Sequence, residues 1–287
     1  TPSLMMACSG LVNAILDPIL IFGWGPIPAF GVEGASIASV ISWTVSFSLI
    51  LYLIMVKRKL VATGHQPLPE FIRISRRILH IGLPAAGANM LTPLAMAVLT
   101  AIMASYGAHA VAAYGVGARI ESIACLVVLA LSMTLPPFVS QNFGAKQLPR
   151  IADAYQLCLG FVMKWQFAVY LLLAIAAPWL AAVFSDDAQV QHLICWFVWI
   201  LPLGYGLQGI VILTNSSLNA LHLPLRALSL SVVRLFVFYV PIAWLGGKLF
   251  GVIGIFAGGL LANVLIALTA LLVFRRTLTD LSSQTND

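Results

Sequence analysis

Long apolar segments dominate the chain and are separated by short polar stretches. A helix needs about 20 consecutive, mostly apolar residues to cross the hydrocarbon core of a bilayer. Continuous rather than alternating apolar runs favour helices over a membrane β-barrel. The pattern therefore predicts an all-α polytopic membrane protein with eight transmembrane helices, at residues 2–22, 34–56, 79–105, 120–140, 165–184, 193–218, 225–245 and 252–274.

The composition agrees with this interpretation and excludes several classes of protein. Of the 287 residues, 61% are hydrophobic and 8% are charged, whereas about a quarter of the residues in a soluble domain are charged. So low a charged fraction excludes a soluble enzyme, a disordered protein and a nucleic-acid partner. The net charge of +6 therefore needs an explanation within a membrane protein.

Positive charges gather in alternate loops, which predicts the orientation in the membrane. Cytoplasmic loops carry an excess of Lys and Arg, whereas the intervening loops hold few cations and include the acidic pair Asp186 and Asp187. We therefore expect both ends of this chain to be cytoplasmic, in a protein of the plasma (inner) membrane. The cations in the loops expected inside are Lys57, Arg58, Lys59, Arg73, Arg76, Arg77, Lys146, Arg150, Arg226, Arg275 and Arg276.

Two distant segments resemble each other, which suggests an internal repeat. GVEGASIASVISW (residues 31–43) resembles GVIGIFAGGLLAN (residues 251–263), and each opens an apolar helix after a glycine-rich loop. If the second and eighth helices correspond, the repeat has six helices, and four helices of the first repeat are missing from this chain. The pattern thus predicts the C-terminal part of a twelve-helix transporter with two six-helix lobes.

This repeat divides the chain into four predicted parts. Residues 1–56 are expected to be the last two helices of the N-terminal lobe, and residues 79–276 the six-helix C-terminal lobe. Residues 57–78 are basic and contain proline, which favours a cytoplasmic connector between the lobes. The alternative is an ordinary loop with an amphipathic segment on the membrane surface. Residues 277–287 are expected to be a cytoplasmic tail.

Asp17 is the most informative polar residue because it lies inside the first apolar segment. A carboxylate within a membrane span usually faces the bundle interior or a water-filled cavity. Ser9, Asn13 and Asp17 are spaced by four and so share one helical face, while Pro18 frees a backbone carbonyl one turn earlier. Together they predict a proton- or cation-binding site. The alternative is that Asp17 caps the end of the helix.

Other polar residues inside apolar segments are candidates for lining a cavity. Asn89 lies in the third predicted helix, and Gln208 and Asn215 lie in the sixth. Amides also commonly form hydrogen bonds between membrane helices, so both roles remain open. Arg234 lies well inside the seventh helix, where it either extends to the interface or faces a cavity.

The remaining chemically active residues have simpler interpretations. Glu121 is expected at the start of the helix at 120–140, where a carboxylate interacts favourably with the helix dipole.

The sequence lacks the motifs of nucleophilic, metal-dependent and phosphate-binding enzymes, so we predict no enzyme activity, metal or organic cofactor. The cysteines lack ligand spacing and are interpreted as packing residues; they are Cys8, Cys125, Cys158 and Cys195.

Several motifs resemble the multidrug and toxic compound extrusion (MATE) family of transporters. NAILDPILIFG (13–23) and GVEGASIASVIS (31–42) resemble its fifth and sixth helices, and IGLPAAGANM (81–90) resembles the start of the seventh. ARIES (118–122) and PPFVSQNFGAK (136–146) resemble the eighth helix and the loop that follows. The resemblance covers essentially the whole chain and implies twelve helices in two lobes.

The resemblance also implies roles for two residues. In the DNA-damage-inducible-protein-F-like branch, an asparagine and an aspartate of the fifth helix belong to the coupling site, and Asn13 and Asp17 match them. That site also uses an aspartate of the first helix, which this chain does not contain. The other bacterial branch uses an acidic residue on the seventh helix, which IGLPAAGANMLTPLAM lacks.

The expected function is therefore secondary active antiport. We expect export of lipophilic, predominantly cationic solutes in exchange for H+ or Na+, with the lipid bilayer and the missing N-terminal helices as partners. One alternative is a flippase of related architecture for lipid-linked oligosaccharides, which needs a cationic cavity for a diphosphate. Another is an inactive remnant whose helices insert without forming a complete pathway.

Overall fold

The computed structural model describes residues 2–25, 28–57 and 68–286, nearly all of which are helical. The chain forms two compact units, Thr1–Phe71 and Ile72–Asp287. Their boundary falls within the predicted connector at 57–78, of which residues 58–67 lie outside the described residues. The assignment of lobes and connector stays a prediction.

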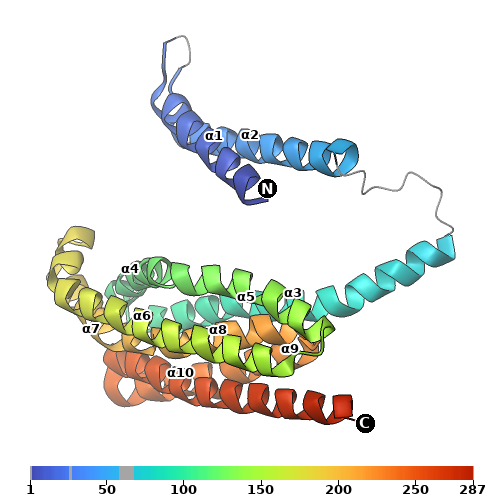
Figure 1. Ribbon diagram of the computed structural model, residues 1–287. Helices are drawn as coiled ribbons and strands as arrows, with labels where there is room; N and C mark the ends of the chain where they lie inside the picture. The colour runs from blue at the N-terminus through green and yellow to red at the C-terminus, as the bar shows by residue number, and fades with distance from the viewer. Residues whose placement is uncertain (1, 26–27, 58–67, 287) are drawn as a thin grey trace. The chain divides into compact units, whose positions relative to one another are not determined.

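The first unit is a pair of helices, α1 (Pro2–Phe22) and α2 (Gly31–Tyr52), which run side by side (Figure 1). A π-helical segment, η1 (Leu53–Lys57), continues α2. The two helices are in backbone contact at Gly34, where a Cβ atom would overlap the backbone carbonyl of Leu20. The Phe30 N–H also donates to the Leu20 carbonyl over 2.9 Å. Glycine at position 34 therefore permits this backbone contact.

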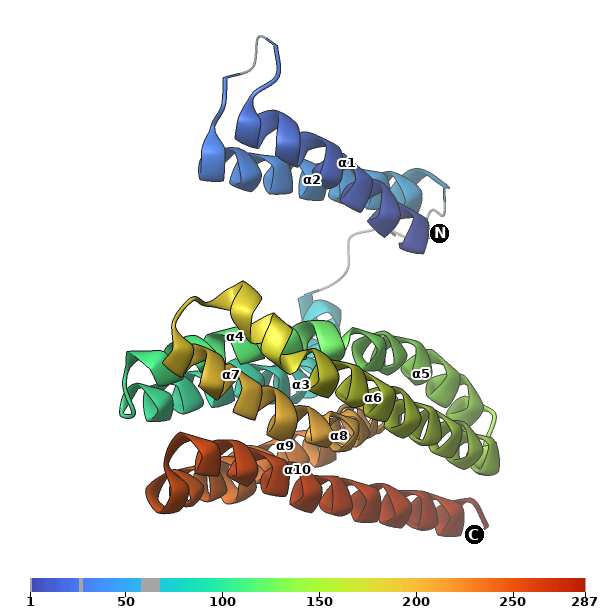
Figure 2. The same ribbon diagram turned by 90° about the vertical axis from the view of Figure 1, so that its left-hand side faces the viewer.

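The second unit is a helical bundle in which α8 packs against α5, α6 and α10 (Figures 1 and 2). Several of its helices are longer than the roughly 20 residues that a membrane requires; α3 and α6 have 37 residues each. In chain order the elements are α3 (Leu68–Ala104), α4 (Ala108–Ala124), α5 (Leu126–Gly144), α6 (Leu148–Phe184), α7 (Ala188–Ile200), η2 (Leu201–Gly204), α8 (Tyr205–Ala220), α9 (Pro224–Val232), η3 (Val233–Tyr239) and α10 (Val240–Asn286).

All eight predicted spans are present as helices. Four are single helices, α1, α2, α3 and α6. Three are composite: α4 with α5, α7 with α8, and α9 with η3 and the first part of α10. The rest of α10 is the eighth. Within the described residues, six helical stretches are long and apolar enough to cross a membrane; the last, Pro224–Ser283, contains two spans, and Ala7–Phe22 is a shorter apolar helix.

The composite spans are interrupted at defined positions. Cys125 has non-helical dihedral angles (φ −88°, ψ 0°) and separates α4 from α5. The side-chain amide of Gln166, on α6, donates to the carbonyl of Ala124 over 3.0 Å, which satisfies a backbone group at the break. Between α7 and α8, the 3-10 turn η2 contains Pro202, which cannot donate a helical hydrogen bond. At the first break the carbonyl of Ala124 is therefore satisfied within the protein, as a membrane span requires.

Helix α10 folds back on itself at Phe250 and Gly251, so it contributes to two spans. Gly251 has φ +63°, a left-handed conformation that glycine adopts without strain. Beyond the turn the two arms meet at backbone level, since a Cβ atom on Gly254 would overlap the Gly246 carbonyl and one on Gly246 would overlap the Gly254 carbonyl. Small residues thus allow close helix contact, as is typical of membrane helices.

Two large apolar clusters hold the ends of the second unit. One joins α3, α4, α7 and α10 through residues that include Met103, Phe197 and Phe256. The other joins α5, α6, α8 and the end of α10, and in it Tyr155 stacks on Phe274 with ring centroids 3.9 Å apart. Each cluster is buried well away from solvent, so the ends of the bundle are firmly packed.

The loops of the second unit lie at two opposite ends of its helices, as alternating topology requires. At one end Asp187 caps α7: its Oδ1 accepts from the backbone N–H groups of Val190 (3.2 Å) and Gln189 (2.7 Å), and its Oδ2 lies 3.2 Å from His109 Nε2. The backbone hydrogen bonds from Val190 and then Gln189 lower the pKa of Asp187. At the other end Arg226 contacts Asp280. Which end faces the cytoplasm stays a prediction.

Several helices extend beyond their predicted limits. The fourth span begins at Ala108, not at residue 120, because α4 is continuous through a stretch of alanine and glycine that is only weakly apolar. Helix α10 runs through the predicted tail to Asn286. Thr277, at the start of that tail, is fully buried and accepts a 2.7 Å hydrogen bond from Arg226. The tail is therefore helical in its described part.

Candidate functional site

Asp17 and Asn13 form a polar pair within α1. The Asn13 Nδ2 donates to Asp17 Oδ1 over 3.3 Å, and both side chains are half-buried in the first unit. Pro18, which follows inside the same helix, has no N–H to donate to the carbonyl one turn earlier. A carboxylate, an amide oxygen and a free carbonyl therefore lie on neighbouring turns, and together they suit a proton or a small cation. Whether this pair couples transport stays a prediction.

Ser9, predicted on the same helical face, holds α1 and α2 together. Its hydroxyl donates to the backbone carbonyl of Ser42 over 3.0 Å. Ser42 is itself buried and donates to Ala38. The hydroxyl of Ser9 is thus engaged between helices, one of the two roles that polar residues play in membrane proteins.

A second polar pair joins α4 and α8. The side-chain amide of Gln208 donates to Glu121 Oε1 over 2.8 Å, and both residues are half-buried. The predicted position of Glu121 at a helix start is wrong, because α4 begins at Ala108 and Glu121 lies near its C-terminal end. The carboxylate therefore lies within a membrane span and does not interact with a helix N-terminus.

Aromatic residues lie in a buried cluster next to this second pair. Cys125 and Tyr205 belong to one cluster with Ile120, the residue before Glu121, and Tyr239 packs against it. Tyr205 is 1% exposed, and its hydroxyl has no hydrogen-bond partner among the described residues. Arg234 is half-buried in the π-helical segment η3, a type of distortion that is frequent at functional sites. Arg234 therefore lies within a span and is partly covered by the bundle.

The other predicted cavity residues lie apart from this cluster. Asn215 on α8 donates to Ser231 on α9 over 3.1 Å, and its Oδ1 is buried without a partner among the described residues. Asn89 is exposed on α3. Asn215 thus serves at least as a contact between helices, whereas Asn89 remains available on the surface of the second unit.

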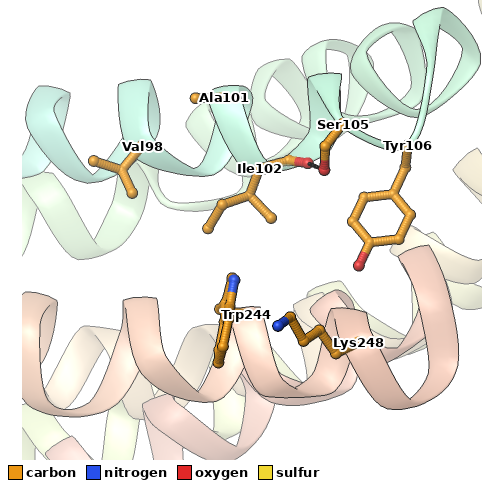
Figure 3. A pocket seen from close by; sticks show the side chains of 7 residues that line it. All are labelled: Val98, Ala101, Ile102, Ser105, Tyr106, Trp244 and Lys248. Atoms are coloured by element: carbon orange, nitrogen blue, oxygen red, sulfur yellow. Dashed lines mark hydrogen bonds between the residues drawn. The ribbon is translucent and has the colours of Figure 1, made fainter.

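A pocket of about 440 Å³ lies between the C-terminal end of α3 and the first arm of α10 (Figure 3). Ile102, Ser105 and Tyr106 face Trp244 and Lys248 across it. The Lys248 ammonium lies 4.0 Å from the centre of the Trp244 ring. A lysine and aromatic rings at a helix end are typical of anchoring at the membrane interface.

Metal ligands are sparse in the described part of the chain. Within those residues no group of three or more His, Cys, Asp or Glu side chains is arranged to hold a metal ion. The four cysteines are free thiols, and Cys125 is buried at the break between α4 and α5.

Comparison with known proteins identifies the family. The MatE family model matches residues 84–245, more than half of the chain. The chain therefore belongs to the MatE family. It is 37% identical over its whole length to the FAD transporter of Shewanella oneidensis, and 24% identical over 93% of its length to the multidrug export protein MepA of Staphylococcus saprophyticus.

The fold agrees with this assignment. The crystal structure of the Vibrio cholerae MATE transporter VcmN in the bent form matches 98% of the chain with a TM-score of 0.86 and 31% identity. The predicted family, the all-α fold and the absence of enzyme function among such transporters are thereby confirmed. The chain spans 64% of the length of the FAD transporter and 63% of VcmN.

Proposed function

We propose that this chain belongs to a secondary active antiporter of the plasma (inner) membrane that exports small organic solutes in exchange for a cation. The observation that carries the proposal is the Asn13–Asp17 pair, a hydrogen-bonded amide and carboxylate inside a membrane span beside a helical proline. H+ is the coupling ion that needs the fewest ligands, and Na+ is the alternative.

The physical basis is a carboxylate whose charge depends on the bound cation. An ionised aspartate at the centre of a membrane helix costs about 2.5–3.5 kcal/mol on insertion scales, so a bound proton or cation favours a drier arrangement of α1. A cation bound preferentially in one arrangement shifts the population toward it. In two-lobe transporters such a shift exposes the solute site to alternate sides of the membrane.

Lipophilic, cationic solutes are the first substrate class to test. The MepA relatives are named multidrug export proteins, and the spans contain amides that can contact such solutes, among them Gln208 and Asn89. We expect both ends of this chain in the cytoplasm, because the basic loops lie at the end of the second unit that contains Arg226.

FAD is a second candidate, favoured by a specific observation. The relative named FAD transporter is 37% identical over the whole chain. FAD carries an anionic diphosphate, and two arginines lie within the spans: Arg119, exposed on α4, and Arg234, half-buried on η3. Guanidinium groups bind phosphates through charge-assisted hydrogen bonds. An anionic flavin and a cationic drug are therefore alternatives that one assay separates.

The test uses the full-length protein in inside-out vesicles, with ethidium or FAD as the probe. A pH or Na+ gradient is imposed, and uptake is normalised to protein amount. We expect one of the two gradients to drive the uptake of one of the two probes. Asp17→Asn should abolish that uptake, because the amide keeps the shape of the side chain but cannot bind and release a proton. Asp17→Glu is the matched control and should retain part of it. Wild-type activity in Asp17→Asn would refute the proposed coupling site.

A further inference from the structure

We propose that Glu121 is a second proton-binding group of this transporter, located in the second unit and distinct from Asp17. The inference rests on the proposed cation-coupled antiport, which it extends. Glu121 lies within the span formed by α4 and α5, and its side chain is half-buried. A carboxyl group in that position is expensive to ionise and usually functional.

The contacts of Glu121 suit a group that changes its protonation state. Gln208 donates to one carboxylate oxygen over 2.8 Å. Among the described residues, no Lys, Arg or His forms an ion pair with Glu121. The carboxylate is thus held by a neutral amide, which can also hold the protonated form. A glutamate that stayed ionised inside a span would be expected to pair with a cation.

Tyr205 supplies an independent indication. Its hydroxyl is buried and has no partner among the described residues, and Tyr205 belongs to the same buried cluster as Ile120, the residue before Glu121. Buried hydroxyl groups nearly always form a hydrogen bond. An unpartnered hydroxyl in this cluster is explained if a protonated carboxyl or a water molecule completes its hydrogen bonds in another state of the cycle.

The surroundings of Glu121 suit a proton better than a metal cation. Tyr114, Cys125 and Tyr205 belong to one buried cluster with Ile120, the residue before Glu121, and Tyr239 packs against it. The side-chain partner of Glu121 is the neutral amide of Gln208, and within the described residues no group of three or more His, Cys, Asp or Glu side chains is arranged to hold a metal ion. A proton is taken up by the carboxylate itself and needs no further ligands. We therefore expect the site to take H+ in preference to Na+.

The first test is spectroscopic and does not depend on transport. The purified full-length protein is titrated from about pH 5 to about pH 9 while difference infrared spectra record carboxyl protonation. We expect Glu121→Gln to remove one titrating carboxyl band that Asp17→Asn leaves in place. The glutamine keeps an acceptor oxygen for Gln208, so the helix contact survives. An unchanged spectrum in Glu121→Gln would overturn the proposal.

The second test separates this inference from the proposed function. With the probe that the wild type transports, we expect Glu121→Gln to lose about tenfold of the pH-driven uptake. Glu121→Asp, which keeps a carboxyl group, should retain driven uptake. Wild-type driven uptake in Glu121→Gln would refute the role of Glu121 alone. No cation-driven uptake in the wild type would instead refute the proposed antiport, and the infrared titration would still report on Glu121.

Discussion

Substituting Gly254 with alanine is expected to destabilise the second unit. The two arms of α10 meet at this residue, where a Cβ atom would overlap the backbone carbonyl of Gly246 and come within 2.9 Å of the Cβ of Phe250. Neither obstacle can rotate away, since one belongs to the backbone and the other is fixed to it. The arms must therefore separate to admit one methyl group.

The size of the effect follows from the cost of overpacking. Extra methyl groups in a well-packed core cost about 1–3 kcal/mol, and a domain of about 150–250 residues changes its melting temperature by about 2–4 °C for each kcal/mol. Taking about 2 kcal/mol, we expect Gly254→Ala to lower the melting temperature by roughly 4–8 °C. Transport should fall with the folded fraction.

A thiol-reactive fluorophore provides the assay. Cys125 is 5% exposed, so a variant that keeps it as the sole cysteine reacts when the bundle opens. Gly160→Ala is the matched control: it is also a helical glycine, on α6, and a Cβ atom there has nothing within 4 Å. Its melting temperature should be unchanged or higher, because alanine favours a helix by about 1 kcal/mol. Equal melting temperatures for the two variants would refute the close approach of the arms.

Three further predictions concern the second unit. Ala145→Cys should be protected from an impermeant thiol reagent on intact cells and Asp186→Cys should be labelled; the reverse would contradict the topology. The backbone hydrogen bonds from Val190 and its neighbour lower the pKa of Asp187 below its usual 3.8. The stability advantage of wild type over Asp187→Asn should therefore be full above that value and shrink as the pH falls through the lowered pKa, as thermal melts will show. Tyr155→Phe removes a buried 2.6 Å hydrogen bond to α8 and should cost about 1 kcal/mol in the same melts.

The sequence was sufficient to predict the spans and the pair in α1. Both depend on local information: the length of apolar runs, and the spacing of four that places Asn13 beside Asp17. Each composite span corresponds to a single predicted apolar segment. This also follows from local information, because crossing a bilayer requires a certain total apolar length and tolerates breaks in the helix whose backbone groups are hydrogen-bonded. The turn at Gly251 was anticipated only as a glycine-rich loop.

The Glu121 cluster could not be predicted in the same way. Glu121 and Gln208 are far apart in sequence and meet because α4 packs against α7, which continues through η2 into α8; no local pattern encodes this packing. The alanine- and glycine-rich start of α4 hid the true beginning of the helix, so Glu121 was placed at a terminus. The break at Cys125 involves neither proline nor glycine, and its compensation by Gln166 comes from another helix. The sequence did contain one signal for this cluster: two charged residues, Arg119 and Glu121, lie within a weakly apolar stretch.

The apolar cluster at one end of the second unit has a consequence for how the neighbouring polar pair changes in evolution. Cys125 and Tyr205 belong to that cluster together with Met103, and they lie close in sequence to Glu121 and Gln208. A substitution that reshapes the polar pair therefore also disturbs the packing between α4 and α7. Changes at this site are expected to need compensating substitutions in the cluster, which limits the order in which they can accumulate.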